Sequence, residues 1–326
     1  MPENIGSVFE LKSPIVAAPM AGVTDYPFRQ ILREYGAELC FTEMVSSHGL
    51  VQGNQRTMDL LDFERQGGKI GVQIFGAETE VMVEAAGIIE TEISPDIIDI
   101  NMGCPAPKVT KGGAGAALMK RPARAFEIAR SVTSAVDIPV TVKMRKGWRR
   151  EDESCLELTD RLAAAGVSAV TIHGRSREEF YQGEADWQVI NRAADKEIFV
   201  IGNGDIFAPE DAGEMLEQTG CDGVMLARGL KGNPWLMERS REFLEKGRCS
   251  SPPSPQEKIL QAMEHLELAC DYYGEERAVP IMRKHISWYL KGLPYCTEVR
   301  EKVNRIEDRT GVEEELTSYL NKFTAE

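Results

Sequence analysis

Short apolar segments recur along the first three quarters of the chain and alternate with longer segments of helical periodicity. In one helical segment Val81, Ala85 and Ile88 fall on one face, while Glu80 and Glu84 fall on the other. The short segments are apolar at both alternating positions, which is typical of parallel strands covered by helices. Eight such segments are present, over residues 15–20, 39–45, 70–75, 97–103, 139–145, 169–174, 199–204 and 223–228.

The number of repeats favours a closed barrel over an open sheet. A doubly wound sheet would show the same alternation, but eight strand–helix pairs over about 245 residues match the length of a TIM (β/α)8 barrel. We therefore predict an α/β fold with a TIM barrel over residues 1–250. In such a barrel the active site lies where the strands end at their C-terminal side.

The alternation stops at a segment rich in proline and serine, Cys249-Ser-Ser-Pro-Pro-Ser-Pro255, which cannot continue a helix. Amphipathic helices are predicted beyond it, over residues 256–273, 276–291, 295–309 and 312–323. We expect a separate helical domain over residues 251–326.

The cysteine and histidine content argues against a disulfide framework or a structural metal. The seven cysteines are scattered without a CxxC pair, and the four histidines show no ligand spacing. Residues 1–11 carry neither a secretory leader nor a transit peptide, and no apolar run is long enough to cross a bilayer. We expect a cytoplasmic protein with no membrane segment and no obligate protein partner.

Polar or otherwise unusual residues collect at the predicted strand ends. The loops after strands seven and eight, Gly202-Asn-Gly-Asp-Ile206 and Ala227-Arg-Gly229, occupy the place where barrels of this type commonly bind a phosphate. Their glycines would let backbone N–H groups approach an anion, although plain turns would use the same residues. The other strand-end residues are Pro19, Met20, Gln73, Asn101, Cys104, Lys143, Arg145 and His173.

Lys143 and Cys104 are the two side chains with the clearest chemistry. A lysine at the end of a buried strand needs a partner, which is either an internal carboxylate or the ring of a flavin, whose reduced anionic form a cation would stabilise. Gln73 would bind the same ring or satisfy the backbone. Cys104 precedes Pro105 in a loop expected to overhang the barrel mouth. Because an ordinary thiol is mostly protonated at neutral pH, Cys104 could donate a proton.

These stretches together resemble the tRNA-dihydrouridine synthases, in particular their bacterial B-type branch. The most diagnostic motif is Asn101-Met-Gly-Cys-Pro105, and the similarity extends over almost the whole chain. The other matching stretches are residues 18–29, Gln73, Val142-Lys-Met-Arg145, His173-Gly-Arg-Ser-Arg177, Gly202-Asn-Gly-Asp205, and Arg283-Lys-His285 with Trp288 and Tyr289.

The resemblance implies an FMN-dependent oxidoreductase that takes electrons from NADPH and reduces the C5=C6 bond of uridine in the tRNA D-loop to 5,6-dihydrouridine. Hydride would pass from N5 of reduced FMN to C6, with Cys104 as the general acid that protonates C5. The flavin ligands would be Pro19, Met20, Ala21, Gln73, Lys143, His173, Asn203, Gly204, Asp205, Ala227 and Arg228. The substrate ligands would be Asn101, Arg145, Arg175, Arg177, Arg283 and Lys284, with the helical domain binding tRNA.

The net charge of −14 is unusual for a nucleic-acid-binding protein. Acidic residues concentrate in the predicted outer helices, whereas basic residues follow the strand ends, so the charges predict a local positive field around the mouth. In the helical domain Arg277, Lys284, Trp288 and Lys291 share one helical face, which is either a solvated surface or an RNA contact.

Two other functions stay open from the residues alone. One is a flavin barrel that acts on a free pyrimidine, of the dihydroorotate dehydrogenase type, because the C5=C6 chemistry is the same. It would need neither the helical domain nor a basic mouth. The other is a non-catalytic tRNA-binding factor, which would not need the thiol of Cys104.

Overall fold

The computed structural model describes residues 9–63 and 67–324, so most of the N-terminal segment expected to lack a leader lies outside the described residues. All its strands are parallel and belong to one sheet, with the order β1-β9-β8-β7-β6-β5-β4-β2 and with β3 paired to β4. The strands are β1 (Ile15–Ala17), β2 (Leu39–Phe41), β3 (Val45–Ser46), β4 (Lys69–Phe75), β5 (Ile97–Met102), β6 (Val140–Arg145), β7 (Ala169–His173), β8 (Phe199–Asn203) and β9 (Gly223–Leu226).

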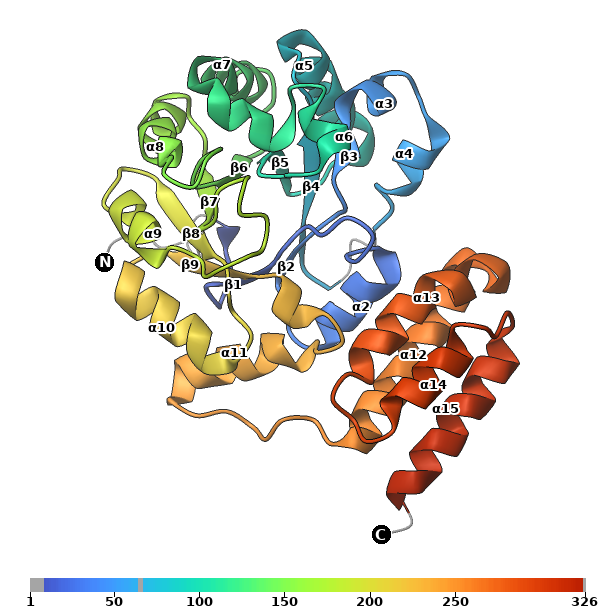
Figure 1. Cartoon of the computed structure of the whole chain (residues 1–326). Coiled ribbons are helices and arrows are strands. Elements are labelled where there is room, and N and C mark those ends of the chain that lie inside the picture. Colours follow the sequence, from blue (N-terminus) through green and yellow to red (C-terminus); the bar gives the residue numbers. More distant parts are fainter. Residues whose placement is uncertain (1–8, 64–66, 325–326) are drawn as a thin grey trace.

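The sheet curls into a nearly closed barrel of eight strand positions, which confirms the predicted TIM barrel (Figure 1). The segment predicted as one strand over residues 39–45 is split into β2 and β3. Both parts pair with β4, and between them the Thr42 hydroxyl accepts the backbone N–H of Gln73 at 3.3 Å. Because the Thr42 hydroxyl takes the place of a backbone carbonyl as the acceptor for Gln73, the backbone ladder with β4 is interrupted between β2 and β3, although both strands run parallel to β4.

Helices follow every barrel strand and surround the sheet. They are α2 (Tyr26–Glu34), α3 (Ser47–Val51), α4 (Gln55–Asp59), α5 (Thr79–Ile88), α6 (Pro107–Thr110), α7 (Pro122–Thr133), α8 (Ser154–Ala164), α9 (Trp187–Ala194), α10 (Pro209–Thr219) and α11 (Trp235–Lys246). A π-helical turn, η1 (Ile89–Ile93), extends α5, and short 3-10 turns follow β5 and β9 as η2 (Gly115–Lys120) and η3 (Arg228–Leu230). None of the described helices is both long and apolar enough to span a membrane.

The inside of the barrel is apolar at its N-terminal end. Phe41 packs there in a cluster with Leu39, Ile97, Ile201 and Met225. A side chain at Gly71 would meet the Phe41 ring at 2.4 Å, so glycine is required to make room for it. Because these side chains fill the N-terminal end of the barrel, a ligand can bind only at the C-terminal ends of the strands.

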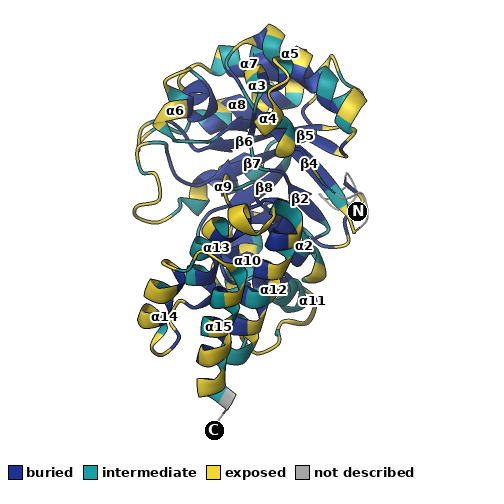
Figure 2. Cartoon of the chain, turned by 90° about the vertical axis from the view of Figure 1, so that its right-hand side faces the viewer, coloured by how far each residue is buried: buried dark blue, intermediate teal, exposed yellow. Residues whose placement is uncertain are grey.

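The C-terminal part of the chain forms its own helical unit with its own apolar core (Figure 2). Its helices are α12 (Pro255–Tyr273), α13 (Glu275–Tyr289), α14 (Cys296–Val303) and α15 (Arg309–Thr324). The sequence predicted one helix over residues 295–309, but α14 ends at Val303. Asp308 explains the break, because its carboxylate accepts the Gly311 N–H at 2.8 Å and starts a new helix.

The helical unit docks mainly on α2, where aromatic rings mediate the contact. Phe28 stacks on His265 with centroids 5.5 Å apart, and Tyr26 stacks on Tyr272 at 4.5 Å. The Tyr35 hydroxyl donates to Gln261 at 2.6 Å. The two parts of the chain therefore have a tightly packed junction.

Candidate active site

A cavity of about 360 Å³ opens at the C-terminal ends of the barrel strands. It brings together predicted site residues that are far apart in sequence, and a narrow side hollow next to it is lined by Gly204, Asp205 and Gly229. A larger hollow, between residues 55–63 and helices α12 and α13, contains none of the predicted site residues. The predicted residues that line the main cavity are Pro19, Met20, Ala21, Gln73, Asn101, Cys104, Lys143, Arg145, His173, Asn203, Ala227 and Arg228.

Strand register explains why these side chains meet. Asn101 of β5 lies opposite Lys143 of β6, and His173 of β7 lies opposite both Arg145 and Asn203 on its two neighbours. Since side chains alternate along a strand, residues at matching levels point to the same side of the sheet. The strands thus supply Gln73, Asn101, Lys143, Arg145, His173 and Asn203, while the segments that follow β1, β5 and β9 supply the rest of the predicted lining, including Cys104 and Arg228.

Below the cavity lies a buried polar network centred on Asp99, which the sequence analysis did not single out. Its carboxylate accepts from the Gln73 amide and the Thr141 hydroxyl, each at 2.6 Å. Gln73 in turn accepts from the Asn101 amide at 2.8 Å. Burial raises the pKa of Asp99 to about 6, although Gln73, Thr141 and the ammonium of Lys143 oppose the shift.

Lys143 reaches the cavity above this network. Its ammonium donates to the Asn203 side-chain oxygen at 2.9 Å, and Asn203 donates to the Met225 carbonyl at 2.7 Å. Burial lowers the pKa of Lys143 to about 8, with Asp99 opposing the shift and Arg145 adding to it. Lys143 therefore has both an internal carboxylate neighbour and access to the cavity, so the two interpretations of this lysine are compatible.

The loop that carries Cys104 is fixed by Asn101. The Asn101 side-chain oxygen accepts the N–H groups of Gly103 and Cys104 at 3.1 and 2.8 Å, while its amide nitrogen donates to Gln73 and, weakly, to the Met44 sulfur at 3.5 Å. A uracil base could accept a hydrogen bond from the Asn101 amide only in place of the weak contact with the Met44 sulfur, because the other polar positions of this side chain are occupied. Cys104 is half-buried at the cavity wall.

His173 is held as a neutral imidazole. Burial is the main cause that lowers its pKa well below the usual value, and the cations of Lys143, Arg145, Arg175 and Arg228 lower it further. Its Nδ1 accepts the Arg175 N–H at 3.1 Å, so we assign the proton to Nε2. Nε2–H is then available as a donor to a ligand.

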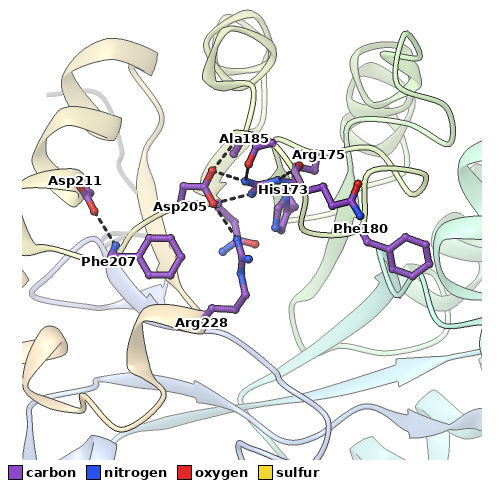
Figure 3. Close-up of polar contacts among 12 residues, drawn as sticks. His173, Arg175, Phe180, Ala185, Asp205, Phe207, Asp211 and Arg228 are labelled. Carbon is purple, nitrogen blue, oxygen red and sulfur yellow. Dashed lines mark hydrogen bonds and ion pairs between the residues drawn. The ribbon is translucent and has the colours of Figure 1, made fainter. Parts of the chain in front are cut away.

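Asp205 organises the cations next to the side hollow (Figure 3). Its carboxylate accepts from both terminal nitrogens of Arg175, at 2.7 and 2.6 Å, from Arg228 at 2.9 Å and from the Ala185 N–H at 2.7 Å. Burial would raise the pKa of Asp205, but these donors lower it overall. In the described residues the Asp205 carboxylate therefore forms ion pairs with Arg175 and Arg228, and Arg228 stays partly exposed at the hollow.

The remaining predicted substrate ligands lie in different environments. Arg145 is buried, with hydrogen bonds to the carbonyls of Gly103, Ser176 and Phe180, so it joins two rim loops. Arg175 is also buried, in the ion pair with Asp205.

Like Arg175, the other three predicted substrate ligands are not among the residues that line the cavity. Arg177 lies at the rim between the rings of Trp148 and Phe180, with its guanidinium carbon 4.8 and 5.0 Å from their centroids. Arg283 donates to the Ile306 carbonyl inside the helical unit at 2.9 Å. The ammonium of Lys284 lies near the Gly22 turn.

Sequence reasoning missed several residues that line or support the cavity. Asp99 could have been found, because an aspartate inside an apolar strand is the same signal that identified Lys143 and Gln73. Tyr181 carries no such signal; its ring lies 4.6 and 5.3 Å from the guanidinium carbons of Arg228 and Arg145. Met44 also lines the cavity. So does Lys231, which was expected at the mouth as one of the basic residues that follow the strand ends but was not assigned a role in the site.

Comparison with known proteins identifies the family. The family model described as "Dihydrouridine synthase (Dus)" matches residues 15–324, which include every residue of the cavity. The chain belongs to the dihydrouridine synthase (Dus) family. The "Probable tRNA-dihydrouridine synthase" of Rickettsia conorii is 41% identical over 97% of this chain and 96% of that protein. The tRNA-dihydrouridine synthase B of Pasteurella multocida is 39% identical over 94% and 92%, which supports the bacterial B-type branch within the Dus family.

Solved structures with a similar fold are more distant. Histamine dehydrogenase from Rhizobium sp. 4-9 superposes with a TM-score of 0.55 at 14% identity, over 79% of this chain and 49% of that chain. A 2-naphthoyl-CoA reductase gives the same TM-score at 12% identity, over 72% and 50%. This chain spans about half of each, and these likenesses concern the barrel fold alone.

Proposed function

We propose that this Dus family protein uses FMN, reduced by NADPH, to convert uridine in the D-loop of tRNA to 5,6-dihydrouridine. The observation that carries the proposal is the convergence of Cys104, Lys143 and His173 on one cavity, beside a glycine-lined hollow with Arg228. The names of the relatives, tRNA-dihydrouridine synthases, support tRNA as the substrate. Residues 1–250 would hold the flavin, and the helical unit over residues 251–326 would orient the tRNA.

The residues at the site fit a flavin mononucleotide. Gly204 has a φ of 129°, and a side chain there would lie 2.7 Å from the Ala185 side chain; a side chain at Gly229 would lie 2.3 Å from the Ile206 carbonyl oxygen. Both positions therefore require glycine, whose missing side chain would let backbone N–H groups approach a phosphate in the hollow, with Arg228 and the Nε2–H of His173 as further donors. Lys143 and Gln73 would lie along the edge of the ring system.

The chain would contribute positioning and a proton to the reaction. The bound flavin supplies the hydride that adds to C6 of uracil. Cys104 would give its thiol proton to C5 from the other side of the base, and the Asn101 hydrogen bonds hold the Cys104 loop in place for this transfer. A uridine in folded tRNA must be flipped out to reach the cavity, at a cost of a few kcal/mol.

The proposal is tested with purified protein and with cells. We expect the protein to bind FMN and to form dihydrouridine in unmodified tRNA when NADPH is supplied, and to leave orotate and free uracil unreduced. Dihydrouridine should be lost from tRNA of a strain lacking this gene and return when the gene is restored. A colourless protein that cannot bind FMN would contradict the proposal, and efficient turnover of a free pyrimidine would favour the dihydroorotate dehydrogenase type.

A further inference from the structure

Lys231 occupies a fixed position where the barrel mouth meets the helical unit. It follows η3, lines the main cavity, and places its ammonium 4.8 Å from the centroid of the Trp288 ring on α13. The next residue, Gly232, has a φ of 65°, and a side chain there would lie 2.3 Å from the Trp288 carbonyl carbon. Because the turn packs closely against α13, the backbone next to Lys231 is held at this junction.

The positive charge of Lys231 lacks a counterion in the described part of the chain, where no carboxylate forms an ion pair with it. Its electrostatic neighbours are Arg228 and Lys284, which have the same sign, and burial together with these two cations lowers the pKa of Lys231. Arg228 is compensated by Asp205 at 2.9 Å. The Trp288 ring attracts the ammonium through its π face but carries no negative charge that would neutralise it.

Lys284 lies on the same side of the mouth, one helical turn before Trp288. Its ammonium is 3.6 Å from the position that a side chain at Gly22 would take, and Gly22 directly follows the cavity wall of residues 19–21. Asp25 and Glu43 are the carboxylates that face it. Asp25 accepts hydrogen bonds from the Phe28 N–H and the Tyr273 hydroxyl, and Glu43 accepts the Gly22 N–H. Both carboxylates also face the Arg29 guanidinium, and none of the described ion pairs joins either of them to Lys284.

We propose that Lys231, with Lys284 beside it, binds a backbone phosphate of the RNA strand whose nucleotide enters the cavity. The inference rests on the proposed function. The phosphate is assigned to RNA because Lys231 is absent from the side hollow lined by Gly204 and Gly229, where the flavin phosphate is expected. Lys231 instead faces the junction with the helical unit, from which the tRNA would arrive.

The test compares Lys231→Gln, Lys231→Arg and the control Lys246→Gln in the holoenzyme. Lys246 lies on α11, which follows the same turn, and is exposed and paired with Glu242 at 3.6 Å. Four quantities are measured: the Kd for FMN, the KM for NADPH, the KM for tRNA, and the slope of log tRNA affinity against log salt. A phosphate contact contributes nearly one unit to that slope.

Lys231→Gln should raise the KM for tRNA roughly tenfold and flatten the salt slope by about one unit, with FMN and NADPH binding unchanged. Lys231→Arg should restore the slope, and Lys246→Gln should match the wild type. An unchanged slope for Lys231→Gln would overturn the inference. So would a weakened Kd for FMN or a raised KM for NADPH, which would assign the lysine to those phosphates. Failure of the wild-type protein to form dihydrouridine would instead contradict the proposed function, since tRNA binding is measured separately.

Discussion

Replacing Asp205 by asparagine should destabilise the barrel, because it leaves a buried arginine without its counterion. Arg175 is 2% exposed and makes a two-nitrogen contact with the Asp205 carboxylate. Breaking a buried ion pair by removing one partner costs about 3–5 kcal/mol. Arg175 keeps hydrogen bonds to the carbonyls of Gln182 and Gly183, and Asp205 is 23% exposed, so we expect the lower end, about 3 kcal/mol.

Urea unfolding at pH 7 of the wild type, Asp205→Asn, Arg175→Met and the double variant measures this cost. The double variant should lose less stability than the two single variants added together, because it leaves no buried charge unpaired. Glu157→Gln, which removes an exposed pair with Arg161, is the control and should cost at most about 0.5 kcal/mol. A loss below about 1 kcal/mol for Asp205→Asn, or strict additivity in the double variant, would refute the reasoning.

The pH dependence of the same variants gives an independent check. The pKa of Asp205 is lowered in the folded protein, so the ionised carboxylate contributes stability that is fully present above its unfolded pKa of about 4. That contribution should disappear as the pH falls through the folded pKa. The difference between the wild type and Asp205→Asn should therefore shrink below about pH 4.

Three further predictions concern the cavity. Cys104→Ala should keep its yellow flavin but lose dihydrouridine formation, measured by mass spectrometry of tRNA nucleosides; wild-type turnover would exclude the thiol as the acid. Gly204→Ala should weaken FMN binding at least tenfold by fluorescence titration, since the added methyl group would clash with Ala185, whereas Gly87→Ala has free space and should not. Burial raises the pKa of Asp99 to about 6, so the wild type should lose roughly 3 kcal/mol of stability relative to Asp99→Asn as the pH rises from about 4 through 6. A pH-independent difference would show that Asp99 does not titrate there.

The sequence predicts the barrel well because eight apolar strands and their helices repeat one local pattern. It also predicts most of the cavity lining, since polar residues at strand ends such as Lys143 and His173 can only meet at the mouth. It cannot predict contacts that depend on how the helical unit docks. Lys231 and Trp288 are 57 positions apart, and neither carries a local signal for the other. Arg283 illustrates the opposite case: it sits in a matching motif, yet it packs inside the helical unit.

The barrel has a seam, because β1 and β2 end the hydrogen-bonded path and touch without a ladder between them. The chain crosses this seam through α2, the helix that Phe28, Tyr26 and Tyr35 attach to the helical unit. The C-terminal helices thus pack beside the one place in the described barrel where two neighbouring strands, β1 and β2, share no hydrogen-bonded ladder. If these contacts hold the two edge strands together, cutting the chain after residue 250 should speed amide exchange in β1 and β2 well before it affects β6 and β7.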